Sequence, residues 1–173
     1  MKHSCGALLF TRDKNNQLGV ILGLEDDEWL PFKGCNESNE TYEETAIREI
    51  LEETCGLIQI TNISLEHRLT SKRKHYKIGL VLVDYDICDK FPKARNIENL
   101  QEAYYEKKKI KFFPLDDVLY SEVHNLSKAS IRYYWNMMQS NILPIDNCRC
   151  RKLSFDKRFL FKIKHSLTKQ MIF

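Results

Sequence analysis

The sequence contains no long hydrophobic run. No stretch of its 173 residues approaches the ~20 consecutive apolar residues of a transmembrane helix. The first residues, Met1 to Cys5, also lack the apolar core and small-residue cleavage site of a secretory signal peptide. We therefore expect a protein that neither spans a membrane nor is secreted. We place it in the cytoplasm, with the nucleus as the alternative.

A disulfide framework is absent as well, as are internal repeats and low-complexity tracts. The six cysteines show no paired spacing, and a chain of this length builds a hydrophobic core without disulfides. Cys148 and Cys150 are close together, but a zinc site needs a second such pair. We therefore predict reduced, structural thiols.

The net charge is close to zero, but the charges are distributed unevenly along the chain. The chain has 27 Lys and Arg against 24 Asp and Glu, a formal charge of +3. Residues 141–173 hold eight of the basic and two of the acidic side chains and so carry +6, which leaves −3 on residues 1–140. This division predicts a folded domain over residues 1–140 and a basic C-terminal extension over residues 141–173.

The sequence does have the composition of a globular domain, with 43% hydrophobic and 29% charged residues. Apolar runs predict strands at residues 6–10, 18–24, 57–65, 77–85 and 110–115. Residues 41–54 and 125–139 are predicted as helices, and the polar segment 86–100, which contains Pro92, as a long loop. The order of these elements predicts an α/β (α+β) fold in which helices cover a mixed sheet.

The helix at residues 41–54 is unusually acidic. Thr41 and Glu44 have the spacing of a capping box, so a helix can begin there. At 100° per residue, one face collects the aliphatic side chains Ala46, Ile47, Ile50 and Leu51. A second arc collects the carboxylates of Glu49, Glu52 and Glu53.

Two interpretations of this acidic arc remain open from spacing alone. A solvated acidic face is common on surface helices. Like charges three and four residues apart repel, however, and no lysine follows any of the three glutamates at i+4. Clustered carboxylate oxygens are the ligands of Mg²⁺ or Mn²⁺, and a bound ion would remove the repulsion. The arc is therefore either a solvated face or a metal site.

The segment from Gly34 to Leu57 resembles the Nudix box. That pattern is Gly, five residues, Glu, seven residues, Arg-Glu, an aliphatic residue, any residue, Glu-Glu, any residue, Gly and an aliphatic residue. Seven positions match at the required spacing, namely Gly34, Glu40, Arg48, Glu49, Ile50, Glu52 and Glu53. The sequence departs from the pattern after them, because two residues precede Gly56 where the pattern has one. This departure affects the helix cap and leaves the glutamates in place.

The similarity extends beyond the box. Residues 29–34, Trp-Leu-Pro-Phe-Lys-Gly, resemble the Trp-x-Phe-Pro-Lys-Gly lead-in of relatives that act on dinucleoside polyphosphates, with Phe and Pro exchanged. Residues 6–10 resemble the first strand of the family, and residues 110–116 a late strand. The similarity covers about residues 3–139 and implies the Nudix fold, a mixed β-sheet sandwiched between helices (α/β/α).

The resemblance also implies an activity. Nudix hydrolases cleave a nucleoside diphosphate linked to another group, and the implied cofactor is Mg²⁺ or Mn²⁺. The implied metal ligands are Glu49, Glu52, Glu53 and the Gly34 carbonyl. Glu53, Glu52 and Arg48 are the implied catalytic residues, with Glu53 as the preferred base and Arg48 orienting a glutamate of the helix. Glu102 and Glu106 are candidates for a base from a later loop.

A nucleotide or polyphosphate is the implied partner, and a dinucleoside polyphosphate such as diadenosine tetraphosphate is the favoured substrate. The candidate substrate-binding residues are Lys33, Arg68, Lys74 and Tyr76, which combine positive charge with a ring for base stacking.

Three alternatives remain open. On a helical wheel, residues from Phe155 onward form an amphipathic basic helix, which would suit RNA and hence hydrolysis of an mRNA cap or another RNA 5′ end. A diphosphoinositol polyphosphate is a second substrate class that suits basic side chains. The third is a non-catalytic Nudix-fold protein that binds nucleotides or RNA. The sequence indicates no oligomeric state.

Overall fold

The structure is a computed structural model that describes residues 2–71, 74–96 and 102–140. The amphipathic helix predicted in the extension 141–173 lies outside these residues and stays a prediction. None of the helices in the described ranges has the length and apolarity needed to cross a membrane. The four cysteines among the described residues carry free thiols, as predicted: Cys5, Cys35, Cys55 and Cys88.

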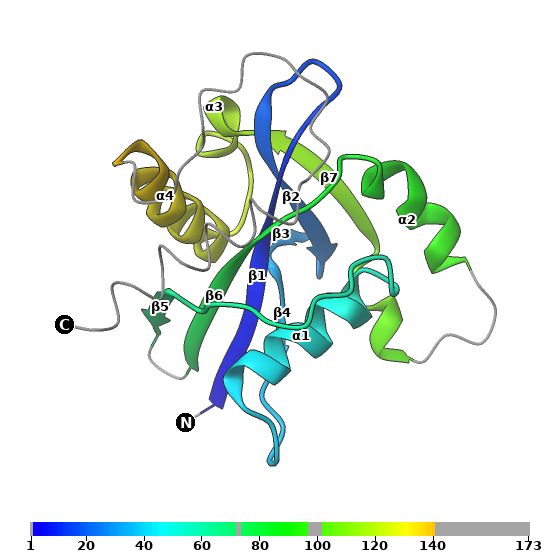
Figure 1. The fold of residues 1–173 in the computed structure, drawn as a ribbon, viewed down its shortest axis with the longest axis vertical. Helices are drawn as coiled ribbons and strands as arrows, with labels where there is room; N and C mark the ends of the chain where they lie inside the picture. The colour runs from blue at the N-terminus through cyan, green and yellow to red at the C-terminus, as the bar shows by residue number, and fades with distance from the viewer. Residues whose placement is uncertain (1, 72–73, 97–101, 141–173) are drawn as a thin grey trace.

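The strands of the described residues form one mixed, seven-stranded sheet (Figure 1). They are β1 (Lys2–Arg12), β2 (Leu18–Glu25), β3 (Glu28–Leu30), β4 (Phe32–Cys35), β5 (His67–Thr70), β6 (Lys74–Leu82) and β7 (Lys109–Pro114). The main order is β3-β2-β1-β6-β5, with β4 paired to β1 and β7 paired to β2. Four of the five predicted strands, those at residues 6–10, 18–24, 77–85 and 110–115, are therefore confirmed.

Strand β1 is the centre of this sheet. It pairs in parallel with β6 from Lys2 to Phe10. Along its opposite edge, its first half pairs antiparallel with β4 and its second half with β2. Because β4 carries Lys33 and Gly34, this pairing places the start of the Nudix-like segment against the middle of the sheet.

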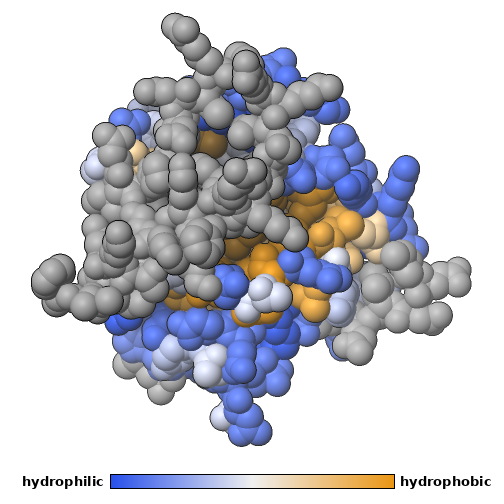
Figure 2. Space-filling model, viewed as in Figure 1, coloured by the Kyte–Doolittle hydropathy of each residue, from blue (hydrophilic) through white to orange (hydrophobic). Residues whose placement is uncertain are grey.

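Helices cover both faces of the sheet, which confirms the α/β/α sandwich. They are α1 (Tyr42–Glu53), α2 (Ile87–Arg95), the short 3-10 helix η1 (Glu102–Tyr105), α3 (Leu115–Val118) and α4 (Asn125–Gln139). Successive β1 side chains point to opposite faces. Leu8 and Phe10 join a core with α3 and α4, whereas Ala7 and Leu9 join a core with α1 and α2. Figure 2 shows hydrophobic surface between α1 and α2 and hydrophilic surface over α1 itself.

The strand predicted at residues 57–65 is wrong. The segment follows α1 without pairing to any strand, although Ile58 and Leu65 are buried. It lies on the face of the sheet over Gly79 of β6, where a Cβ atom would come within 2.7 Å of the Ser64 carbonyl oxygen. Its apolar residues therefore reflect packing onto the sheet face instead of membership in the sheet.

The loop predicted at residues 86–100 is also wrong, because residues 87–95 form α2. The helix buries Ile87, Phe91 and Ala94, which follow one another at helical spacing. Pro92 lies inside the helix, so the proline did not end it. The burial of one apolar stripe outweighed the local cost of proline.

Candidate metal site

Helix α1 begins where its capping box predicts. The Thr41 hydroxyl accepts a hydrogen bond from the Glu44 backbone amide at 3.2 Å, and the Glu44 carboxylate accepts one from the Thr41 amide at 2.7 Å. Both halves of the capping box are therefore present. The first turn of the helix is therefore closed by its own side chains.

The end of α1 shows how the extra residue before Gly56 is accommodated. The Cys55 amide donates to the Glu52 carbonyl at 2.9 Å, and the Gly56 amide donates to the Leu51 carbonyl at 2.7 Å. These two bonds make a Schellman turn in which Cys55 occupies the position usually taken by glycine. Cys55 and Gly56 both have left-handed backbones, with φ of 53° and 76°. The helix therefore ends at Glu53, and the extra residue is taken up by the turn.

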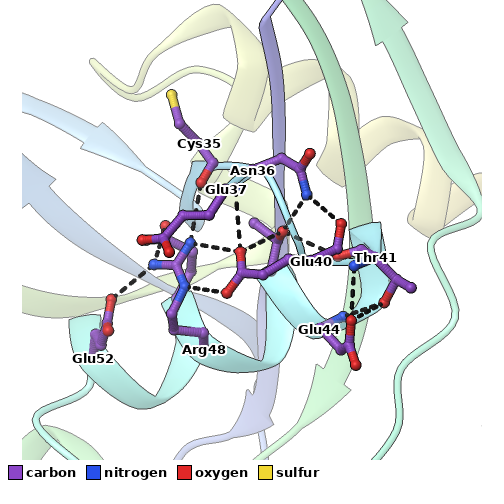
Figure 3. Close-up of polar contacts among 10 residues, drawn as sticks. Cys35, Asn36, Glu37, Glu40, Thr41, Glu44, Arg48 and Glu52 are labelled. Carbon is purple, nitrogen blue, oxygen red and sulfur yellow. Dashed lines mark hydrogen bonds and ion pairs between the residues drawn. The ribbon is translucent and has the colours of Figure 1, made fainter.

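Arg48 ties the acidic residues together (Figure 3). Its guanidinium donates to both carboxylate oxygens of Glu40, at 2.7 and 3.0 Å, and to the Cys35 carbonyl at 3.1 Å. It also donates to Glu49 at 2.8 Å and to Glu52 at 3.0 Å. The hydrogen bonds from Arg48 lower the pKa of Glu40 to about 2. The same bond to Glu40 raises the pKa of Arg48, so this group stays ionised.

Glu49 points from α1 into the protein beside Gly34. It is 6% exposed, and a Cβ atom at Gly34 would lie 2.0 Å from its carboxylate. Glycine at this position of β4 is therefore what lets the carboxylate approach the strand. Burial raises the pKa of Glu49 to about 7, against the opposing effect of Arg48.

Glu53 is completely buried, one turn further along the helix. One carboxylate oxygen, Oε2, accepts a hydrogen bond from the Lys33 backbone amide at 2.6 Å. The other, Oε1, lies 3.0 Å from Nζ of Lys107 but outside hydrogen-bonding geometry, so it forms an ion pair and receives no hydrogen bond. Burial raises the pKa of Glu53 to about 8, although Lys107 and Lys33 act in the opposite direction.

A third glutamate completes a cluster of carboxylates. Glu106, in the segment between η1 and β7, has a carboxylate oxygen that lies within 4.8 Å of oxygens of both Glu49 and Glu53. Glu106 is exposed, whereas the two helix residues are buried. Three carboxylates, each offering a hard oxygen ligand, fit Mg²⁺ or Mn²⁺. Among the described residues, this cluster is the group suited to hold a divalent ion.

Two residues beside the cluster, Glu25 and Lys107, were not among the predicted site residues. Lys107 is completely buried, and its ammonium contacts the carboxylates of Glu25 and Glu53. Nζ of Lys33 lies 3.6 Å from the same carboxylate of Glu25. Burial opposes ionisation of Glu25, but Lys107 and Lys33 outweigh it and lower the pKa of Glu25. The sequence contains no local pattern that predicts this group of charged residues, because they come from β2, β4, α1 and the segment before β7.

The remaining predicted ligands and bases lie around the cluster. Glu52 contacts Arg48 and is not one of the three clustered glutamates. Glu102 begins η1, is exposed and also lies outside the cluster. Gly34 lies directly against Glu49, as described above. The predicted roles of Glu52, Glu102 and the Gly34 carbonyl stay predictions.

The predicted substrate-binding residues are divided between two places. Lys33 lies at the cluster, through its amide and its ammonium. Arg68, Lys74 and Tyr76 lie on β5 and β6, at the edge of the sheet. That edge meets the first turn of α1, where Nζ of Lys77 lies 3.4 Å from the ring centroid of Tyr42. Glu49 and Glu53 lie in the later turns of the helix, so the structure does not bring these three residues to the cluster.

Comparisons with known proteins support the same architecture. No protein-family model matches the sequence, and no curated protein matches it at the level of sequence. Solved structures do match. A mutT/nudix family protein from Listeria innocua superposes with a TM-score of 0.60 and 15% identity, over 82% of this chain and 96% of that one.

Two further structures bear names that concern function. An Ap4A hydrolase from C. elegans, in a binary complex, has a TM-score of 0.57 and 16% identity, over 81% of this chain and 99% of that one. NrtR from Shewanella oneidensis, complexed with a 27mer DNA, has a TM-score of 0.61 and 18% identity, over 81% of this chain and 63% of that one. The fold implied by the glycine, arginine and glutamates of residues 34–56 is thereby confirmed, and the protein has the fold of the Nudix proteins.

Proposed function

We propose that the chain is a pyrophosphohydrolase that depends on Mg²⁺ or Mn²⁺ and cleaves a nucleoside diphosphate linked to another group. The observation that carries this proposal is the convergence of Glu49, Glu53 and Glu106, from two separate segments, at one point beside β4. A merely solvated acidic face would leave such residues exposed and apart. Two of these three are buried instead.

In this proposal Glu49 and Glu53 hold the ion, with Glu52 next to them on the helix. Arg48 orients Glu49 through its 2.8 Å hydrogen bond, and the Lys33 amide orients Glu53. Both carboxylates are therefore held in place before any ligand binds. A divalent ion bound there would neutralise charge on phosphate oxygens and lower the pKa of a water molecule.

We place the general base at Glu106. Glu53 was the preferred base from the sequence, but it is buried and already contacts Lys33 and Lys107. Glu106 is the exposed member of the cluster, so it can meet a water molecule that approaches with the substrate. The base accepts a proton from this water as its oxygen attacks phosphorus, and the phosphoanhydride P–O bond breaks to release the second product with its bridging oxygen.

For the substrate, a dinucleoside polyphosphate remains the favoured class. The lead-in residues 29–34 support it, and the similarity in fold to the C. elegans Ap4A hydrolase agrees with it. Lys33 is the one predicted substrate-binding residue that lies at the cluster. Capped RNA and diphosphoinositol polyphosphates are the competing classes.

The test is a hydrolysis assay with Mg²⁺ and Mn²⁺ on diadenosine tetraphosphate, capped RNA, nucleoside triphosphates and diphosphoinositol polyphosphates. Replacing Glu53 by Gln should lower the rate on the preferred substrate at least about 100-fold, since loss of a ligand should exceed the ~10–100-fold effects of outer-shell changes. Glu43→Gln is the matched control, because Glu43 is an exposed glutamate in the first turn of the same helix. Undiminished hydrolysis by the Glu53 variant would refute the proposal.

A second candidate function is a nucleotide-binding protein without catalysis. The similarity in fold to NrtR, a protein solved in complex with DNA, favours this candidate. It predicts nucleotide binding that survives Glu106→Gln and a wild-type protein that hydrolyses none of the four substrates. Calorimetric titration of the wild type with ADP and diadenosine tetraphosphate, run beside the hydrolysis assay, separates the two functions, because binding without hydrolysis of any of the four substrates fits only the second.

A further inference from the structure

One lysine side chain lies inside the group of carboxylates at the candidate metal site. Lys107 is completely buried. Its ammonium forms ion pairs with Glu25 on one side and with Glu53 on the other, the latter at 3.0 Å. Glu53 thus belongs to two groups at once, because it also lies in the cluster with Glu49 and Glu106.

Strand β2 is shaped to receive this lysine. Gly23 and Glu25 are two residues apart on β2, so they share one face of the strand. A Cβ atom at Gly23 would lie 2.6 Å from Cδ of Lys107. The stem of the lysine therefore passes over a glycine, and its ammonium reaches the carboxylate that follows on the same face.

The backbone of Lys107 is also held on both sides. The Arg95 guanidinium, from α2, donates to the Lys107 carbonyl at 2.9 Å. The next amide, that of Lys108, donates to the Leu24 carbonyl of β2 at 2.8 Å. The ammonium is therefore held between Glu25 and Glu53 by contacts at its head, along its stem and at its backbone.

Stability alone is a poor explanation for this arrangement. Burying an ion pair costs desolvation of both partners, and an apolar side chain of similar volume often stabilises a protein equally well. The lysine supplies what an apolar side chain cannot, a fixed positive charge between two carboxylates. An ammonium and a divalent ion also compete for the same carboxylate oxygens, because like charges repel at short distance.

We propose that Lys107 acts as a resident cation that limits how many divalent ions the site takes. Its ammonium occupies the side of the site between Glu25 and Glu53, so that a divalent ion is held by Glu49 and Glu53 only on the side that faces Glu106. This inference rests on the proposed metal site. It adds that the chain itself fills a cation position that Glu25 and Glu53 would otherwise offer to a second ion.

The test is a count of Mn²⁺ ions bound per chain, measured by the electron paramagnetic resonance signal of free Mn²⁺ during titration. Lys107→Met keeps the length of the stem and removes the charge, and it should bind one more ion than the wild type. Lys108→Met is the matched control, because Lys108 is half exposed and its contact, at 3.7 Å, is with the exposed Asp27. The double variant Glu25→Gln with Lys107→Met should return to the wild-type count, because the second site then lacks its own carboxylate.

The outcomes separate this inference from the proposed function. Equal Mn²⁺ counts for the wild type, Lys107→Met and Lys108→Met overturn the resident-cation proposal and leave the metal site intact. A wild type that binds no Mn²⁺ contradicts the metal site itself. If Lys107→Met fails to fold without metal, circular dichroism should show that millimolar Mn²⁺ restores the fold and that the Lys108 variant needs none. A Lys107 variant that stays unfolded in Mn²⁺ also overturns the proposal.

Discussion

The two ends of helix α1 place the same side chain, glutamate, in opposite environments. At the first end, Glu40 receives hydrogen bonds from Arg48 and Thr45, and Glu44 receives them from Thr41. These bonds lower the pKa of both carboxyls, that of Glu40 to about 2. At the other end, burial raises the pKa of Glu49 to about 7 and that of Glu53 to about 8.

The opposite pKa shifts at the two ends have one explanation. A carboxylate with enough hydrogen-bond donors has a lowered pKa, whereas one that loses water by burial has a raised pKa. Glu40 is half buried and Glu44 is exposed, and both carboxylates accept hydrogen bonds within the protein (Figure 3). At the second end burial removes water, and Oε1 of Glu53 has only its ion pair with Lys107 and no hydrogen bond. The first end is therefore complete as a structural unit, whereas the proposed function assigns a divalent ion to the second. Three predictions test this contrast.

The largest effect is expected from removing Arg48, the residue that joins the two ends. Arg48→Met leaves Glu40, Glu49 and Glu52 without their shared cation. We expect the free energy of unfolding to fall by about 3 kcal/mol, as for other partly buried ion pairs that lose one partner. Urea unfolding at pH 7 measures this loss. The control is Arg132→Met, which changes an exposed arginine of α4 and should stay within about 0.5 kcal/mol of the wild type. Equal stability of the two variants would show that Arg48 does not join the ends.

An intermediate effect is expected from pH in metal-free protein. Folding raises the pKa of Glu49 from 4.5 to about 7. Between pH 4.5 and pH 7, the native state therefore keeps a proton on Glu49 that the unfolded state has already released. The pKa of Glu53 rises in the same direction, to about 8. Stability should therefore fall as pH rises from about 5 to 7.5, by about 2 kcal/mol. Glu40, with its pKa lowered to about 2, acts in the opposite direction and loses its contribution only below pH 4.5.

Urea unfolding in EDTA across this range measures the slope. Glu49→Gln and Glu53→Gln should each make it shallower, Glu43→Gln should not, and Mg²⁺ should remove the fall at the upper end of the range. A wild-type slope of the opposite sign would contradict burial as the dominant influence on the pKa of Glu49.

The smallest effect is expected at the capping box. Thr41→Ala removes the hydroxyl that accepts from the Glu44 amide, which should cost about 1 kcal/mol of stability, and Thr41→Ser should restore most of it. Hydrolysis should be unchanged, because the cap lies more than two turns from Glu53. A tenfold loss of activity without loss of folding would mean that the two ends of the helix are not independent.

The sequence predicted those parts of the structure that depend on local spacing. The capping box at Thr41, the helix that follows it and the strands around the turn at residues 13–17 each depend on residues close together in the chain. Glycine, arginine and glutamates at fixed intervals also indicated the fold. The error at residues 86–100 arose because Pro92 was given more weight than the buried stripe of Ile87 and Phe91.

The parts that the sequence did not predict depend on distant residues. In the sequence, Lys107 is the first of three successive lysines at the start of a strand. Its burial depends on Gly23 and Glu25, which lie far earlier in the chain. Glu106 was a candidate base, but its approach to Glu49 depends on how η1 and β7 are placed. The segment at residues 57–65, wrongly predicted as a strand, is apolar because it packs on a face of the sheet. The spacing of apolar residues cannot distinguish a segment that packs on a sheet from a strand that pairs within it.

The parallel pairing of β1 with β6 also has a consequence for synthesis of the chain. Translation delivers β1 first, but its long parallel partner begins only at Lys74. The residues that meet Glu53 from the far side, Glu106 and Lys107, follow it by more than fifty positions. Until those residues have been added, Glu49 and Glu53 lack the partners that surround them in the folded protein. The site arises late in translation, when the segment before β7 closes over the end of the helix.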